Sequence, residues 1–184
     1  MPVLTASRTP AQLLAELERL VEVDWSTVWG GVPEEADQRA SWCAALGWRP
    51  LWFQAGLWVR TAGGSRLHVA TSAPGRPVTG VGHTLWAARA RDTDENDRVA
   101  ELSLNHFTAH LTALRSVMGE PALNDTWAGH VAIWRFRTPG APIFELGLML
   151  GLGSQTAPAP ADARIGLICH NPLEQPTPGP GRRI

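Results

Sequence analysis

Two histidines lie four residues apart in a segment with helical periodicity, which places both imidazole rings on one face of the predicted helix. His106 and His110 match the spacing of the histidine pair in H-E-x-x-H zinc sites. No glutamate stands between them, and no nearby carboxylate is an obvious third ligand. We therefore predict no bound metal and no cofactor. Three histidines on predicted strands could still complete a site in three dimensions: His68, His83 and His170.

The two cysteines are weak candidates for a nucleophile. Cys169 and His170 are neighbours on a predicted strand, and their side chains therefore point to opposite faces and cannot form a dyad. Cys43 lies inside a predicted helix, away from the N-terminus where the dipole lowers a thiol pKa. The sequence has no G-x-S-x-G elbow and no phosphate-binding Walker loop. We therefore expect a protein that is not an enzyme.

The strongest local charge feature is a run of five acidic residues: Asp92, Asp94, Glu95, Asp97 and Glu101. Capping explains part of it, because acidic groups stabilise the first turn of a helix and Asp94 can serve as the N-cap. Two carboxylates are enough for that purpose. The surplus predicts a contact surface for a basic partner.

Tryptophan is abundant, with nine residues in the chain. Most are expected in the core, but Trp52 and Trp58 fall on one face of a predicted strand together with Gln54 and Arg60. Two interpretations remain open for that face. The N-terminal helices cover it, or it exposes aromatic anchors of the kind enriched in binding hot spots.

Composition limits the class of protein. The 16 basic residues are all arginine, and lysine and tyrosine are absent, which predicts a G/C-rich genome such as that of an actinobacterium. A formal net charge of -1 argues against binding to nucleic acid or to an anionic membrane surface. No apolar run reaches the ~20 residues needed to cross a bilayer, and no secretion signal precedes the first helix. We expect a cytoplasmic protein with reduced, buried thiols, as a monomer or a homodimer.

Periodicity predicts an α+β fold, with an antiparallel sheet of about six strands, two N-terminal helices and one long central helix packed on it. The helices are expected over residues 10–23, 33–46 and 94–118. The strands are expected around residues 51–60, 66–72, 79–89, 131–137, 143–150 and 164–170. The long helix should pack four residues on the sheet: Leu104, Phe107, Leu111 and Leu114. Residues 1–170 form one domain in this interpretation, 153–163 a long loop, and 171–184 a Pro-rich flexible tail.

Several segments carry a family resemblance. They are A-L-G-W at 45–48, L-x-x-L-R-S-V-M-G-E-P at 111–121, W-R-F at 134–136 and E-L-G-L-M-L at 145–150. With these segments the chain resembles small actinobacterial domains found beside secreted polymorphic toxins, which look like dedicated immunity proteins. The overall arrangement is also similar to the type III secretion chaperone fold. Neither resemblance supplies catalytic residues.

The resemblance and the acidic run together predict a protein-binding module, an immunity protein that neutralises a cognate toxin by direct binding. Its contact residues are expected to be the acidic run with Trp52 and Trp58. The first alternative is an enzyme or small-ligand-binding protein with a pocket lined by tryptophan and histidine. The second is a client binder that resembles a secretion chaperone.

Overall fold

The computed structural model describes residues 1–125, 130–136, 138, 140–154 and 157–174. Within them the chain forms an α+β fold with a single antiparallel sheet of nine strands. The helices are α1 (Pro10–Val21), α2 (Trp25–Trp29), α3 (Ala36–Ala45) and α4 (Asn96–Met118), and a 3-10 turn, η1 (Thr93–Glu95), precedes α4. The strands are β1 (Val3–Ser7), β2 (Trp48–Phe53), β3 (Leu57–Thr61), β4 (Arg66–Ala70), β5 (Gly80–Arg89), β6 (Leu123–Asp125), β7 (Val131–Trp134), β8 (Ile143–Ser154) and β9 (Ala157–His170).

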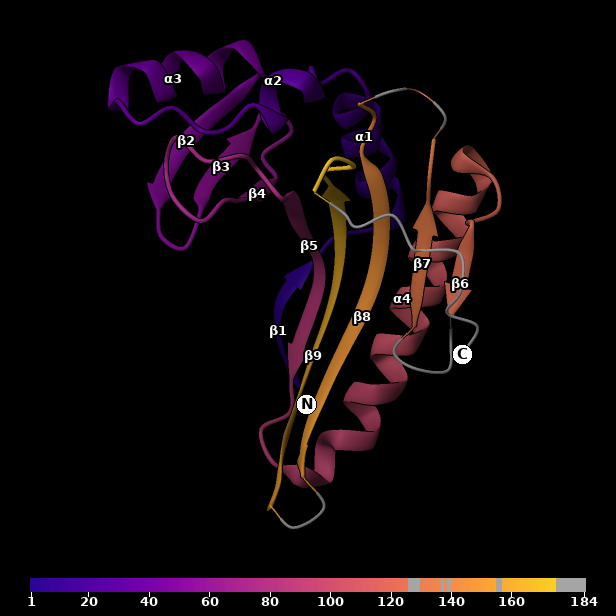
Figure 1. The fold of residues 1–184 in the computed structure, drawn as a ribbon. Helices are drawn as coiled ribbons and strands as arrows, with labels where there is room; N and C mark the ends of the chain where they lie inside the picture. The colour runs from indigo at the N-terminus through magenta and orange to yellow at the C-terminus, as the bar shows by residue number, and fades with distance from the viewer. Residues whose placement is uncertain (126–129, 137, 139, 155–156, 175–184) are drawn as a thin grey trace.

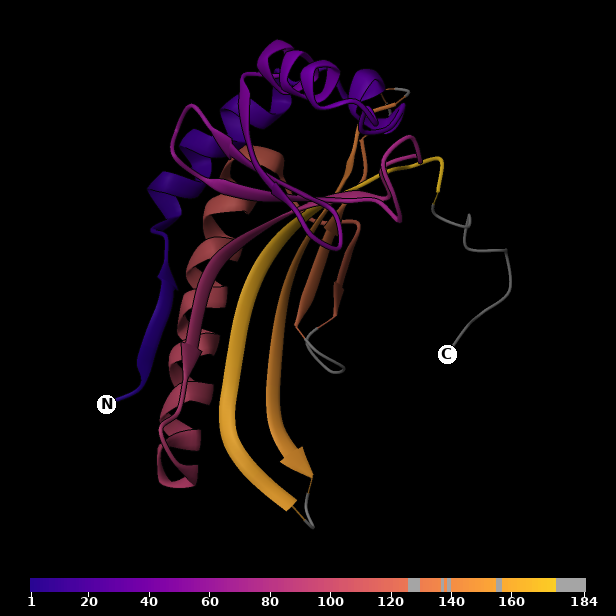
Figure 2. The same ribbon diagram turned by 90° about the vertical axis from the view of Figure 1, so that its left-hand side faces the viewer.

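The strand order is β2-β3-β4-β5-β9-β8-β7-β6. Two strands pair with the same edge of β5: β4 pairs with its first half, and β1 pairs with its second half. Helix α4 runs along one face of β5, β8 and β9, with α1 beside it (Figure 1). Figure 2 shows that the long strands curve away from α4, and that the opposite, concave face of the described sheet carries no helix. We call this the open face.

The expected six strands become nine for two reasons. The predicted strand at 51–60 is a hairpin, β2 and β3, because Ala55 and Gly56 adopt positive φ angles of 49° and 122° and turn the chain. Strands β1 and β6 were not predicted; they are short and add to edges of the sheet. The predicted loop at 153–163 is also wrong, since β9 begins at Ala157.

The helices differ from the prediction in number and in orientation. Three helices precede β2 instead of two, because Asp24 caps the additional short helix α2 with its side chain. Of the four residues of α4 that were expected to face the sheet, three are buried, but Leu104 is 43% exposed. The buried stripe instead takes in Val99, Ser103 and His110, so the helix is rotated relative to the predicted face.

Tryptophans fill much of the core, as predicted for the N-terminal helices. Trp25 and Trp29 are buried and stack with ring centroids 4.9 Å apart. Trp42 of α3 packs edge-on against Trp48 of β2 at 5.9 Å, which fixes α3 to the sheet. Trp86 is fully buried under α4, and Trp127 lies outside the described residues.

The folded part of the chain ends later than the predicted boundary at residue 170. Asn171, the first residue of the expected tail, is buried, and its amide donates to the Val78 carbonyl oxygen at 2.8 Å. The folded part therefore extends beyond residue 170, and the segment 175–184 lies outside the described residues. None of the helices in the described ranges is both long and apolar enough to span a lipid bilayer.

Candidate functional site

The acidic run is divided between structural and exposed groups. Asp94 does not cap the long helix as predicted; instead Asp92 caps the preceding turn η1 by accepting a hydrogen bond from the Asp94 backbone N–H at 3.1 Å. The Glu95 carboxylate lies beside the N-terminal amino group and accepts from the Arg91 backbone N–H at 3.0 Å. These contacts, the amino group first, lower the pKa of Glu95. Of the five residues of the run, Asp94, Asp97 and Glu101 are exposed and their carboxylates form no hydrogen bond or ion pair within the described residues.

The two candidate tryptophans lie on the open face and no helix covers them. Trp52 is 45% exposed, and Trp58 is half-buried. Their rings stack with centroids 5.8 Å apart, and Trp58 also contacts the ring of His68 at 4.8 Å. Of the two interpretations, the one in which the N-terminal helices cover this face is therefore wrong. We call Trp52, Trp58 and His68 the aromatic row.

Strand register explains the row. Trp52 is directly opposite Trp58, and Trp58 is directly opposite His68, so the three side chains cross β2, β3 and β4 side by side. The β2–β3 turn holds the row, because the ring Nε2 of His68 lies 2.8 Å from the Ala55 carbonyl oxygen. A Cβ at Gly56 would lie 2.5 Å from that same nitrogen, so only glycine fits this turn.

A second row of side chains runs beside the first. Arg49 is opposite Arg60, and Arg60 is opposite Arg66, on the same face as the tryptophans. All three arginines are exposed. Among the described residues none of them forms an ion pair. We call these three residues the arginine row.

The sequence prediction missed the arginine row. The signal that could have found it is the turn at Ala55-Gly56, because a hairpin there aligns Arg49 with Arg60. The acidic run, in contrast, leads into α4 on the other side of the sheet (Figure 1). The structure therefore does not bring the predicted acidic and tryptophan contacts together into one surface.

Beyond β4 the open face is hollowed by a pocket of about 410 Å³. Gly82, Ile168 and Glu145 continue the line of the aromatic row across β5, β9 and β8. His170 Nε2 lies 3.0 Å from the Glu145 carboxylate, and this contact lowers the pKa of Glu145. The carboxylate of this part of the face is thus already paired.

The histidines do not form a metal centre within the described residues. His106 stacks on Trp86 at 4.9 Å. His110 is fully buried, and its two ring nitrogens lie 2.7 Å from the His106 carbonyl oxygen and 3.1 Å from the Arg8 carbonyl oxygen. Each imidazole is therefore used in packing or in backbone contacts.

Both cysteines are buried free thiols. Burial raises the pKa of Cys43 to about 11, and it raises the pKa of Cys169 further. Burial therefore disfavours the reactive thiolate form of both residues near neutral pH.

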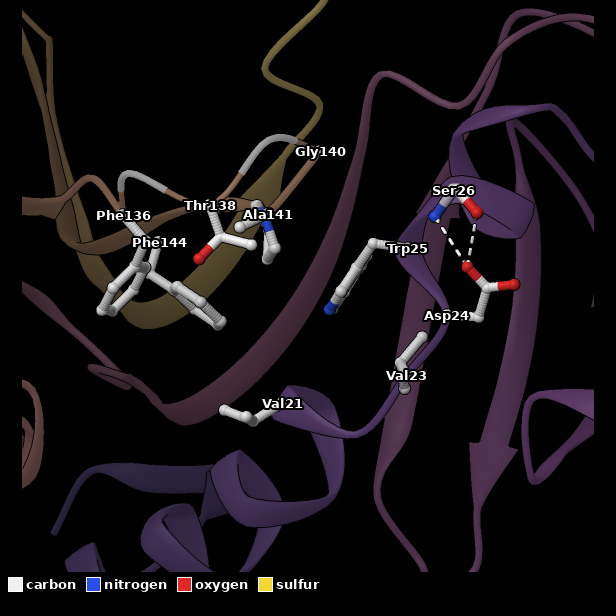
Figure 3. Close-up of a pocket in the computed structure, with 11 residues that line it drawn as sticks. Val21, Val23, Asp24, Trp25, Ser26, Phe136, Thr138, Gly140, Ala141 and Phe144 are labelled. Carbon is white, nitrogen blue, oxygen red and sulfur yellow. Dashed lines mark hydrogen bonds between the residues drawn. The ribbon is translucent and has the colours of Figure 1, made fainter.

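A pocket of about 530 Å³ lies between the C-terminus of α1 and the chain around β8. Figure 3 shows Phe136 and Phe144 on one side, with Val21 and Trp25 across from them. The one carboxylate of its lining is Asp24, whose pKa is lowered to about 2 by hydrogen bonds from the hydroxyls of Ser26 and Thr27. The pocket is apolar, none of the histidines lines it, and its carboxylate is engaged in capping α2.

Comparison of the chain with protein-family models, with curated proteins and with solved structures finds no match. The resemblances to immunity proteins and to secretion chaperones therefore remain predictions, and the candidate site rests on its own geometry.

Proposed function

We propose that the chain is a protein-binding module, and that its activity is to neutralise a toxin by binding it through the open face. The observation that carries the proposal is the aromatic row, an exposed stack of Trp52, Trp58 and His68 on a face that no helix covers. Tryptophan and arginine are the residues most enriched in binding hot spots, and here they stand in adjacent rows.

The open face is also suited to a protein partner in shape. The aromatic row continues into the hollowed part of the open face, where Gly82 and Gly166 leave the backbone without side chains. A partner could therefore approach β5 and β9 closely while its side chains pack against the tryptophan rings. Inhibition by binding needs only such complementarity, and no catalytic group is required.

The test begins with the genes adjacent to this one, and any of them that encodes a secreted protein with a C-terminal toxin domain supplies the candidate partner. Co-expression of the chain should restore growth to cells that produce that toxin domain, and the two purified proteins should form a complex of defined stoichiometry on size-exclusion chromatography. A toxin domain that remains fully toxic in the presence of the folded chain would contradict the proposal.

The pocket of Figure 3 supports one second candidate, a small-ligand-binding protein. Its volume of about 530 Å³ and its Trp25, Phe136 and Phe144 lining fit an apolar ligand. A fluorescent apolar probe such as ANS should then bind the native protein with saturation, and Phe144→Ala should weaken it. Absence of saturable binding would remove this candidate.

A further inference from the structure

The arginine row places like charges side by side, which is expected to lower the stability of the protein. Directly opposite residues in an antiparallel pair are the closest cross-strand neighbours, and like charges at such positions are destabilising. Arg49, Arg60 and Arg66 occupy three such positions in succession, and within the described residues no carboxylate pairs with any of them. An anion placed over the row would remove this repulsion.

The row leads into a polar notch on the edge of β5. The notch lies where β1 stops pairing with β5 and β4 takes over, and it has a volume of about 370 Å³. Three arginines line it, Arg8, Arg66 and Arg164, together with the hydroxyl-bearing Thr84 and the ring of Trp58. Arg66 belongs to both features, so the row and the notch form one continuous basic surface.

The notch is partly organised in the absence of a ligand. The Arg8 guanidinium donates to the Gly64 carbonyl oxygen at 3.3 Å, which holds its side chain across the gap between β1 and β4. His83 also lines the notch, is only 5% exposed, and has no hydrogen-bond partner for its Nδ1 atom within the described residues. In the same part of the chain no acidic residue pairs with Arg8 or Arg164.

We propose that the arginine row and the notch together form a binding site for the carboxylates of an acidic segment of the partner protein. The inference rests on the proposed function, because it specifies the chemistry of the partner that the open face binds. Guanidinium groups pair with carboxylates through two parallel hydrogen bonds, and the neighbouring tryptophans supply the apolar contact that an isolated charge cluster lacks.

Nucleic acid is the competing anion, since arginines beside stacked aromatics also bind single strands. The geometry favours carboxylates. Adjacent strands lie about 4.8 Å apart, so the row spans only about 10 Å, which is short for tracking a phosphate backbone. The chain as a whole carries a formal charge of -1 and provides no extended basic field.

The test uses the purified chain and fluorescein-labelled hexaglutamate, with binding measured by fluorescence anisotropy at low salt. We expect saturable binding that weakens as NaCl is raised. Arg60→Gln and Arg66→Gln should each weaken it about threefold to fivefold. The matched control is Arg98→Gln, an equal charge change at an exposed position of α4, and it should leave binding unchanged. The melting temperature of Arg60→Gln should equal or exceed that of the native chain, because repulsion in the row is relieved.

Three results would overturn the inference. They are no saturable binding of hexaglutamate, equal losses in the Arg98 and Arg66 variants, or tighter binding of a labelled oligo-dT of the same charge. The last result would assign the face to nucleic acid phosphates. The outcome is separate from that of the toxin experiment: a chain that neutralises the toxin without binding hexaglutamate retains the proposed function and loses only this inference.

Discussion

The buried residue His83, which lines the notch, should make the stability of the protein depend on pH in the acidic range. Burial is the largest cause that lowers the pKa of His83, from 6.5 to about 4, while the nearby Glu16 carboxylate opposes the shift and Arg8 and His110 add to it. The folded protein thus keeps this imidazole neutral at pH values where the unfolded chain protonates it. Stability should be complete above pH 6.5 and fall as the pH is lowered toward 4.

The magnitude follows from the shift. A pKa difference of 2.5 units corresponds to about 3 kcal/mol between the two protonation states, lost over the interval from pH 6.5 to pH 4. The assay is urea unfolding of the native chain and of His83→Gln at several pH values in this interval. The native chain should lose about 3 kcal/mol more than the variant between pH 7.5 and pH 4. A constant packing loss in the variant cancels, because the slopes are compared, and parallel pH profiles would refute the reasoning.

Three further predictions concern the helix, its start and the metal content. Leu114→Ala should lower the free energy of unfolding by about 2 to 5 kcal/mol because Leu114 is fully buried, while Leu104→Ala should cost far less; equal losses would show that the buried stripe is misplaced. Asp92→Ala should lower the free energy of unfolding by about 0.5 to 2 kcal/mol, because the capping hydrogen bond is lost. Asp94→Ala, at the cap predicted from the sequence, should leave it nearly unchanged. A larger loss for Asp94→Ala than for Asp92→Ala in urea unfolding would show that Asp94 is the cap. Elemental analysis of the purified protein should find no stoichiometric zinc or iron, and a metal lost on changing His106 would restore the metal hypothesis.

The class of fold and most of its elements were predictable from local signals. Thr9 and Gln12 form the capping box that begins α1, and Pro10 is the first residue of the helix, as the sequence predicted. The alternation of residues 66–72 likewise located β4. Signals of this kind depend only on residues that are neighbours in the sequence, so they can be read without knowledge of the tertiary structure.

The site was less predictable because it depends on register. Trp52 and Trp58 were placed on one face of one strand, and they do share a face, but as a cross-strand pair in a hairpin. That pairing is what aligns Arg49 with Arg60 and then with Arg66, and such an alignment involves residues far apart in the sequence. The rotation of α4 that exposes Leu104 has a similar origin, since tertiary packing under the helix decided which of two neighbouring stripes is buried.

The acidic run remains a predicted contact surface, but the structure changes how it should be tested. Asp92 and Glu95 take part in local contacts at the start of α4, so their replacement would disturb the fold. Asp94, Asp97 and Glu101 are exposed, and their replacement by serine is the appropriate variant. A slower association with a basic toxin at low salt would support this surface, and unchanged kinetics would remove it.

The central claim is that the open face binds the partner protein through the aromatic row. The most direct measurement is the dissociation constant of the complex between the chain and its toxin domain, for Trp52→Ala and for Leu104→Ala. The two side chains are similarly exposed, at 45% and 43%, but they lie on opposite sides of the sheet. The account predicts a loss of about 30-fold or more for Trp52→Ala, as for a hot-spot residue, and no loss for Leu104→Ala. Unchanged affinity in Trp52→Ala, with the fold intact, would contradict it.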